Sequence, residues 1–245
     1  AQTGIIFLAY KDGAAISKTI IDWKLTHPFE YNFTAEDGIR HTVWVINDEN
    51  IIQNLTEAFE TLVPATYIAD GHHRFPESQL SIFDYNRIVK TLNGYTTAEF
   101  LEKLTLKFEV QKVDKANRKP TEEKTFGLYI DHQWYQLKAK PGTYETDPIN
   151  ILDVSILQKN IMSEILGIHD SKTDHRIDFV GGIRGLKELE SIVDSQLAKA
   201  AFACYPVGIH QLFQVADSGD VMPPKSTWFE PKTRDGLIVF QLNKS

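Results

Sequence analysis

Short apolar runs alternate with amphipathic stretches along the whole chain, and this alternation constrains the fold most. Residues 4–10 and 200–205 are continuous apolar runs of strand length, whereas 48–62 and 153–166 repeat apolar residues near the helical period. Interleaved strands and helices, with a hairpin around Asp131, predict an α/β or α+β fold with a mixed sheet. The pattern argues against a helical bundle or a β-sandwich.

Local signals give the expected element positions and two expected N-caps, Asp48 and Thr97. The expected strands are 4–10, 38–46, 66–69, 108–113, 126–131, 134–139, 176–181, 200–205 and 237–242. The expected helices are 14–24, 48–62, 98–108, 153–166, 185–193 and 209–216. A soft boundary in the loop 141–152 predicts two parts, 1–145 and 146–245, that pack as one unit.

Composition narrows the classes of protein to consider. The 245 residues are 42% hydrophobic and 24% charged, which is an ordinary globular balance. The net charge is −7 and there is no basic run, which disfavours nucleic acid as a partner because duplex binding needs a field of Lys and Arg. No apolar run approaches the roughly 20 residues of a membrane span, so no membrane partner is expected.

The single cysteine, Cys204, stands in an apolar strand and is expected to be a small core residue. One cysteine cannot form a disulfide within the chain, so a reducing, cytoplasmic location is predicted. The chain begins Ala-Gln-Thr-Gly, without an initiator Met or a leader signature, and is expected to start inside a larger protein.

The strongest candidate site is the string Asp70-Gly71-His72-His73-Arg74, directly after an apolar strand. Glycine permits close backbone approach to a ligand, successive N–H groups at such a turn can cradle an anion, and a guanidinium matches phosphate. A phosphate or nucleotide site is favoured. A structural, Asp-paired histidine turn is the alternative. A metal site is weaker, because adjacent histidines at a turn rarely aim at one ion.

A second candidate is the turn that contains Gly181, Gly182 and Arg184, between an expected strand and helix. A helix N-terminus after such a turn can face a phosphate. The string matches neither of the common nucleotide-binding glycine motifs. A tight structural turn with pairing of Arg176 and Asp178 explains it equally well.

The third candidate is the segment 221–232, in which three prolines fix an extended path and Lys225, Ser226 and Thr227 offer one charge and two hydroxyls. The segment could be a loop over a ligand or an extended segment packed on the body.

Two smaller candidates complete the set. Glu36 and Asp37 precede Gly38 and are expected first in a turn, although the acids could serve as a base or hold a metal. The other is the string Asp84-Tyr85-Asn86-Arg87, in which Asn86 and Arg87 are polar residues in an apolar context and candidates for contacts to the site.

Taken together, four strings resemble the DUF1015 family of bacterial and archaeal proteins. They are YIADGHHR, DYNRIVKTLNG, TDHRIDFVGGIRGLKELE and GDVMPPKSTWFEPKTRDGLIVFQL. The resemblance covers nearly the whole chain. Family members are longer, with a region before the position of Ala1 and a helix-rich segment after the position of Arg74. Both are expected to be missing here, so part of the site is expected to lie outside this sequence.

The resemblance also implies a function. The DGHHR string is similar to the phosphate-binding motif of the ParB/sulfiredoxin superfamily, which includes ATP-consuming sulfiredoxins, CTP-binding partition proteins and kinases of free serine. It implies an enzyme of phosphoryl transfer that uses ATP or ADP with magnesium and acts on a small hydroxyl metabolite such as free serine. A nucleotide hydrolase stays open, and so does assembly into a homo-oligomer.

The roles that this resemblance implies are residue-specific. The phosphates would lie on Gly71, His72, His73 and Arg74, with Arg184 and Lys225 neutralising charge. The expected catalytic residues are Asp70, His72, Glu36 and Asp37, with the acids as base or magnesium ligand. The alternatives are a ParB-like nucleotide-binding module with a DNA or protein partner, and a scaffold without a ligand.

Overall fold

The computed structural model describes residues 8–10, 14–36, 38–68 and 81–230. The chain divides into two compact units. Unit 1 comprises residues 1–81 and 230–245, and unit 2 comprises residues 82–229. The expected division into 1–145 and 146–245 stays a prediction.

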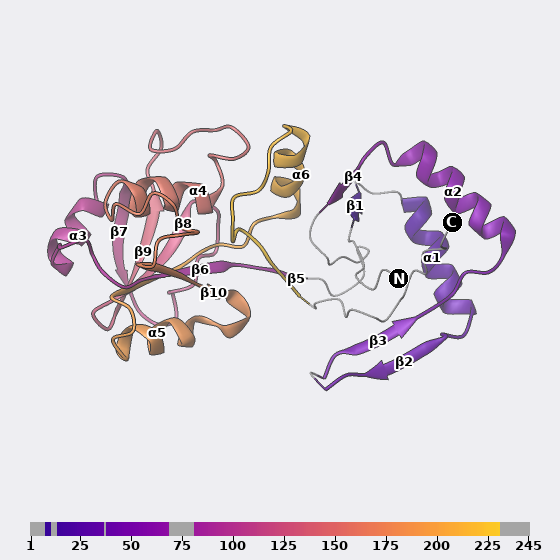
Figure 1. Ribbon diagram of the computed structural model, residues 1–245, viewed down its shortest axis with the longest axis horizontal. Coiled ribbons are helices and arrows are strands. Elements are labelled where there is room, and N and C mark those ends of the chain that lie inside the picture. Colours follow the sequence, from indigo (N-terminus) through magenta and orange to yellow (C-terminus); the bar gives the residue numbers. More distant parts are fainter. Residues whose placement is uncertain (1–7, 11–13, 37, 69–80, 231–245) are drawn as a thin grey trace. The chain divides into compact units, whose positions relative to one another are not determined.

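Among its described residues, unit 1 combines two helices with two short pairs of strands (Figure 1). Its elements are β1 (Leu8–Tyr10), α1 (Ala14–Thr26), β2 (Tyr31–Thr34), β3 (Arg40–Val43), α2 (Glu49–Leu62) and β4 (Thr66–Ile68). β1 pairs with β4, and β2 pairs with β3, both antiparallel. The expected cap at Asp48 is confirmed, because its carboxylate accepts from the backbone N–H groups of Asn50 and Ile51 at 2.9 and 3.0 Å.

Unit 2 is built on a six-stranded sheet in the order β10-β6-β11-β8-β9-β7, and every pairing is antiparallel. Its strands are β6 (Tyr85–Val89), β7 (Phe108–Val113), β8 (Thr125–Ile130), β9 (Gln133–Ala139), β10 (Ile177–Gly181) and β11 (Ala200–Ala203). Its helices are α3 (Thr97–Leu104), α4 (Asp153–Leu157), α5 (Leu186–Asp194) and α6 (Ile209–Asp217). The short strands β5 (Ser81–Phe83) and β12 (Trp228–Glu230) form a separate pair.

Helices cover both faces of the six-stranded sheet, which explains why its central strands carry apolar side chains on both faces. Along β8, Phe126, Leu128 and Ile130 pack toward α3 and α4. Tyr129 lies on the other face, in the cluster that contains Leu189 of α5. Figure 1 shows the same layers, with α3 and α4 on one side of the sheet and α5 on the other. The expected α/β or α+β class is confirmed, and the pairing of the described strands places unit 2 in the α+β group.

The helix ends differ slightly from the expected ones. Thr96, not Thr97, is the N-cap of α3, because its hydroxyl accepts from Glu99 N while the Glu99 carboxylate accepts from Thr96 N. α4 is followed by a π-helical turn, Gln158–Ser163, so the helical stretch expected over 153–166 is present but is not uniformly α.

Some strands were not expected from the sequence. β6 carries Asn86 and Arg87 inside a buried strand, and β2 is exposed along its whole length, so neither shows the usual apolar pattern. The expected strand 237–242 lies outside the described residues. None of the helices described is both long and apolar enough to cross a membrane.

Candidate functional site

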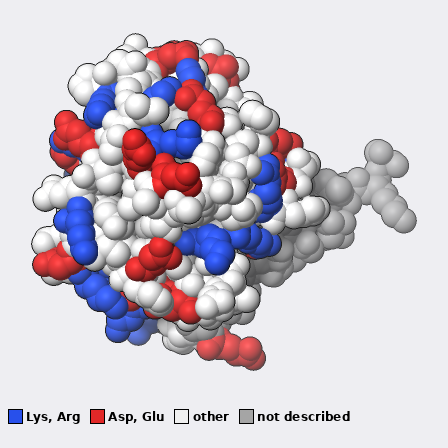
Figure 2. Space-filling view, turned by 90° about the vertical axis from the view of Figure 1, so that its left-hand side faces the viewer, with Lys and Arg blue, Asp and Glu red and all other residues white. Residues whose placement is uncertain are grey.

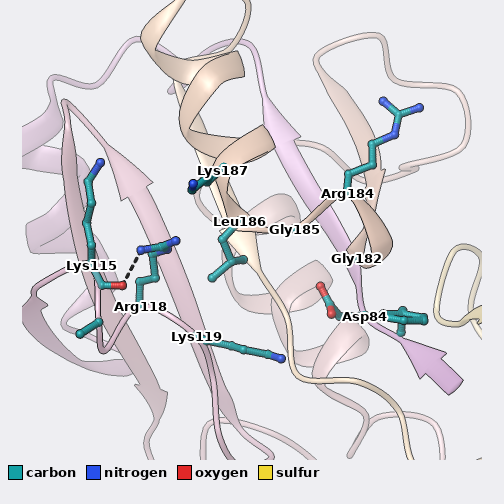
Figure 3. A pocket seen from close by; sticks show the side chains of 11 residues that line it. Asp84, Lys115, Arg118, Lys119, Gly182, Arg184, Gly185, Leu186 and Lys187 are labelled. Carbon is teal, nitrogen blue, oxygen red and sulfur yellow. Dashed lines mark hydrogen bonds between the residues drawn. The ribbon is translucent and has the colours of Figure 1, made fainter.

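Unit 2 contains a cavity of about 440 Å³ beside the first residues of α5 (Figure 3). Three segments line it: the end of β5 with Asp84, the loop after β7, and the turn that leads from β10 into α5. Five of the lining side chains are basic and one is acidic. They are Lys115, Arg118, Lys119, Arg184, Lys187 and Asp84.

The loop after β7 forms the first basic wall. Lys115 and Arg118 share the carboxylate of Glu190 on α5, with N···O distances of 3.2 and 3.6 Å. The indole of Trp134 also donates to this carboxylate, at 2.8 Å. Burial acts to raise the pKa of Glu190, but the hydrogen bonds from Trp134 and Lys115 outweigh it, so the pKa lies below its usual range.

The loop after β7 can lie close over the sheet because the residue of β8 beneath it is a glycine, Gly127. A Cβ at Gly127 would lie 2.5 Å from the Arg118 carbonyl oxygen, which real Cβ atoms do not approach so closely. Because Gly127 has no side chain, the loop after β7 can pack directly against the backbone of β8.

The opposite wall is the glycine-rich turn expected from the sequence. Gly182–Arg184 forms a 3₁₀ turn, and α5 begins directly after Gly185, whose φ of 73° favours glycine. Gly185 makes no side-chain cap to α5, so the first N–H groups of this nine-residue helix have no side-chain acceptor at the cap. These N–H groups and the helix dipole give the wall a partial positive charge.

Asp84 is the carboxylate of the cavity. Its carbonyl oxygen accepts from Gly182 N at 2.8 Å, and a Cβ at Gly182 would lie 2.4 Å from Asp84 Oδ1. Burial raises the pKa of Asp84, although its own backbone amide, Asn86 and Lys119 act in the opposite direction. Figure 3 shows the Lys119 side chain extending toward Asp84, whereas Arg184 extends away from it.

A second group of polar residues lies on the face of β6 that α5 does not cover. Arg87 is only 5% exposed. Its guanidinium donates to the carbonyl oxygens of Tyr85 and Lys225, the latter at 3.0 Å, and lies 3.9 Å from Cys204 Sγ. Burial raises the pKa of the Cys204 thiol to about 12, so this cysteine is a neutral core residue, as expected.

The segment 221–228 docks on this group. Lys225 Nζ lies 3.4 Å from the hydroxyl oxygen of Tyr85 and 5.4 Å from the centre of its ring. Ser226 is buried and its hydroxyl donates to Pro223 O. The Trp228 ring covers Gly181, where a Cβ would lie 2.6 Å from it. The segment is therefore packed on the body of unit 2, and Lys225 is exposed on it.

The residues predicted from the sequence thus fall in different places. Gly182 and Arg184 line the cavity. Gly181 packs under Trp228, and Lys225, Ser226 and Thr227 are not among the residues that line the cavity.

Two of the sequence-based candidates belong to unit 1. Glu36 is exposed in the turn between β2 and β3, where Gly38 has a φ of 79°. Asp37 and the whole string Asp70-Gly71-His72-His73-Arg74 lie outside the described residues, so their roles stay predictions.

The basic residues of the first wall were not expected to be functional. Residues 114–124 are charged and contain Pro120, which is typical of a solvated surface loop. The only sequence signal is the density of cations, with Lys115, Arg118 and Lys119 within five positions. Asp84 begins the smaller candidate string Asp84-Tyr85-Asn86-Arg87, in which Asn86 and Arg87 were the residues expected to contact the site.

The fold defines an α+β protein, and the side chains that line its cavity are mainly basic. The sequence matches the family described as "protein of unknown function (DUF1015)" over residues 1–76 and 75–155. The chain belongs to this family, as the sequence resemblance implied. The two matched stretches meet at residues 75 and 76, directly after the string that ends at Arg74. No curated protein sequence matches the chain.

Several solved structures resemble the whole chain weakly. A mutant of a free serine kinase in complex with AMP has 11% identity and a TM-score of 0.41, covering 93% of this chain and 89% of its own. A mutant of a free serine kinase in complex with ADP has 13% identity and a TM-score of 0.39, with coverages of 92% and 84%. A conserved hypothetical protein from Pyrococcus furiosus has 14% identity and a TM-score of 0.43, with 96% of both chains covered. These values are too low to transfer a ligand or an activity.

Proposed function

We propose that the protein is a nucleotide-binding enzyme of phosphoryl transfer, and that the cavity of unit 2 binds a phosphate group of the nucleotide. One observation carries this proposal: five basic side chains and a single carboxylate surround a cavity at the N-terminus of α5. Helix N-termini with Lys and Arg nearby are well suited to phosphate.

The composition of the cavity fits what phosphoryl transfer requires of a protein. The reaction needs positioning and charge neutralisation more than covalent help from side chains. Lys119 and Lys187 supply point charges, and Arg184, which lies 3.6 Å from the carboxylate of Glu188, supplies a planar fork. The cavity has one aromatic lining residue, Phe83, so it suits the phosphates better than the base of a nucleotide.

Magnesium accompanies ATP or ADP in this proposal. Mg²⁺ is usually held by one or two carboxylates together with phosphate oxygens and water. Among the side chains that the structure describes, no three His, Cys, Asp or Glu residues gather as a metal site. Asp84 is the carboxylate that would contact a nucleotide-bound Mg²⁺, and its raised pKa also suits a group that accepts a proton from a hydroxyl.

The sequence motif supplies the second part of the proposal. The string Asp70–Arg74 is a second proposed phosphate-binding element, with Asp70, His72, Glu36 and Asp37 as candidates for base or magnesium ligand. The acceptor is a small hydroxyl metabolite, and free serine is the first compound to test. The family resemblance of the string supports this part.

Thermal unfolding of the full chain with Mg·ATP and Mg·ADP tests binding, because a ligand of the folded state alone raises the melting temperature. We expect a rise with at least one nucleotide. Arg74→Ala and Lys119→Gln should each weaken affinity about tenfold, the usual scale of a lost charge-assisted contact. Lys112→Gln is the matched control, because Lys112 is an exposed lysine on β7 that does not line the cavity.

Two outcomes would contradict the proposal in different ways. If neither nucleotide raises the melting temperature, the protein does not bind nucleotides in this manner. If Arg74→Ala weakens binding and Lys119→Gln does not, the sequence motif holds the phosphates and the cavity does not.

A further inference from the structure

Asn86 is a fully buried polar side chain that the proposed function leaves unused. Its exposed fraction is 0%, and it stands in the middle of β6, where the next residues on the same face are apolar. An amide costs free energy in such a place unless its hydrogen bonds are made. The packing of the sheet alone therefore does not account for Asn86.

Only one end of this amide group is paired. Its Oδ1 accepts from the backbone N–H of Cys204 at 3.0 Å, and because a backbone N–H requires an acceptor, this bond fixes which end of the group carries the donors. Nδ2 of Asn86 has no hydrogen-bond partner among the residues that the structure describes. Native proteins retain few buried donors of this kind, and each calls for an explanation.

The backbone places the Asp84 carboxylate next to this donor. β6 pairs with β10, and the bond from Gly182 N to Asp84 O, at 2.8 Å, continues this pairing by one residue. Asp84 and Asn86 are two positions apart on an extended chain, so their side chains lie on the same face. Asp84 lines the cavity and Asn86 does not, so the amide lies behind the carboxylate.

The carboxylate and the amide already interact. Burial is the main influence on Asp84 and raises its pKa, whereas Asn86 acts in the opposite direction as a hydrogen-bond donor. The contact nevertheless falls short of full hydrogen-bond geometry. Hydrogen bonds around active sites are often long in the free protein and tighten when the ligand binds.

We propose that Asn86 is a positioning residue that holds the Asp84 carboxylate toward the magnesium ion of a bound nucleotide. The inference rests on the proposed function, in which Asp84 contacts Mg²⁺. Asn86 touches neither the nucleotide nor the metal. Its Nδ2 group donates to one carboxylate oxygen, so the other oxygen keeps one orientation toward the cavity and does not have to be ordered when the cation binds.

The test measures how strongly Mg²⁺ improves ATP binding to the full chain. Calorimetry gives the affinity for ATP with Mg²⁺ and with EDTA, and the ratio of the two is the readout. Asn86→Leu removes the whole amide, whereas Asn86→Asp keeps an oxygen for the backbone N–H of Cys204 and removes only the donor. Each should lower the ratio about tenfold, the usual scale for a residue that orients a metal ligand. Asn86→Leu should leave the affinity for metal-free ATP unchanged.

A double variant shows whether Asn86 acts through Asp84. Asp84→Asn should remove most of the effect of Mg²⁺. Asp84→Asn combined with Asn86→Leu should lose no more than Asp84→Asn alone, because residues that act through one another are not additive.

Asn160→Leu is the matched control for the loss of a buried amide. Asn160 is also 0% exposed, and its Nδ2 donates to Thr143 O at 3.0 Å, but it does not line the cavity. Asn160→Leu should lower the melting temperature and leave the Mg²⁺ ratio at the wild-type value. If Asn86 had a structural role alone, Asn86→Leu would behave in the same way.

The outcomes separate the inference from the proposed function. Wild-type protein that binds neither Mg·ATP nor Mg·ADP contradicts both. Nucleotide binding that Mg²⁺ does not strengthen overturns the inference and leaves nucleotide binding in place. Binding that Mg²⁺ does strengthen, with an unchanged ratio in folded Asn86→Leu or Asn86→Asp protein or with additive losses in the double variant, overturns the role of Asn86 alone.

Discussion

At the scale of single residues, the contact between Gly182 and Asp84 sets one side of the cavity. The amide of Gly182 donates to the backbone of Asp84, and the carboxylate lies where a Cβ would stand. Because Gly182 has no side chain, the Asp84 carboxylate can lie next to the turn that leads into α5.

Gly182→Ala should destabilise the protein by about 1–3 kcal/mol, because the added methyl group meets both the carboxylate and the backbone of Asp84. It should also weaken Mg·ATP binding by moving Asp84. Urea unfolding and calorimetry measure the two effects. Gly208→Ala is the control, since its Cβ would meet only the exposed ring of His210, which can turn away. Equal stability of the two variants would contradict this account.

Asp153, at the first position of α4, predicts an unusual pH dependence. Burial raises the pKa of its carboxyl to about 6, even though Lys124 N and Nζ donate to it. The unfolded value is about 3.9. Between these values the native state binds more protons than the unfolded chain, so the free energy of unfolding falls as the pH rises.

The difference in unfolding free energy between wild type and Asp153→Asn should therefore change across this window. As the pH rises from about 4 to about 6, the wild type should lose up to about 3 kcal/mol of unfolding free energy relative to Asp153→Asn. At higher pH the difference should stay constant. Urea unfolding at pH 4, 5, 6 and 7 measures it. A constant difference between the two proteins would show that Asp153 titrates normally.

At the scale of elements, α5 contributes both to the sheet cover and to the cavity. Leu189 and Val193 pack on the sheet, and the carboxylate of Glu190 forms ion pairs with Lys115 and Arg118. The carboxylate of Glu190 competes with any anion in the cavity for the same two cations.

Glu190→Gln should therefore strengthen Mg·ATP binding several-fold while it lowers stability by about 1–3 kcal/mol, the cost of leaving polar groups poorly paired. Calorimetry and urea unfolding separate the two effects. The control is Glu122→Gln, an exposed carboxylate that pairs with Lys138. Weaker binding in Glu190→Gln, at unchanged Lys112→Gln affinity, would mean that Lys115 and Arg118 do not face the phosphate.

Local signals predicted most helices and hairpins because their causes lie within a few residues. The Asp48 cap and the turn at Asp131 are examples, with Asp131 in a left-handed conformation at a φ of 46°. β6 was missed because Asn86 and Arg87 are buried by tertiary pairing, where Asn86 accepts from Cys204 N at 3.0 Å. No pattern within a few residues of Asn86 predicts a partner so far away in the sequence.

The candidate site was predicted only in part for the same reason. Gly182 and Arg184 belong to a recognisable turn before a helix. Lys119 reaches the cavity because the loop after β7 folds back over Gly127, and Asp84 reaches it because Gly182 packs against its backbone and carboxylate. A charged loop and a charged wall of a cavity have the same composition, and only the fold distinguishes them.

At the scale of the whole molecule, unit 2 contains its own core and its own cavity. The three buried clusters around its sheet and α6 lie within residues 88–222. On the face seen in Figure 2, acidic and basic side chains are intermixed. With a net charge of −7, the chain as a whole repels anions, so binding of a phosphate depends on the local field of the cavity.

The most direct test of the account follows phosphorus itself. The full chain is incubated with Mg·ATP or Mg·ADP and free serine, and ³¹P NMR follows the nucleotide and any new phosphate ester. The account predicts a new phosphomonoester signal that grows as the nucleotide is consumed. This signal should be strongly reduced in Lys119→Gln and retained in Lys112→Gln. No consumption of either nucleotide beyond the rate without protein, for serine or for other small hydroxyl compounds, would contradict phosphoryl transfer as the function.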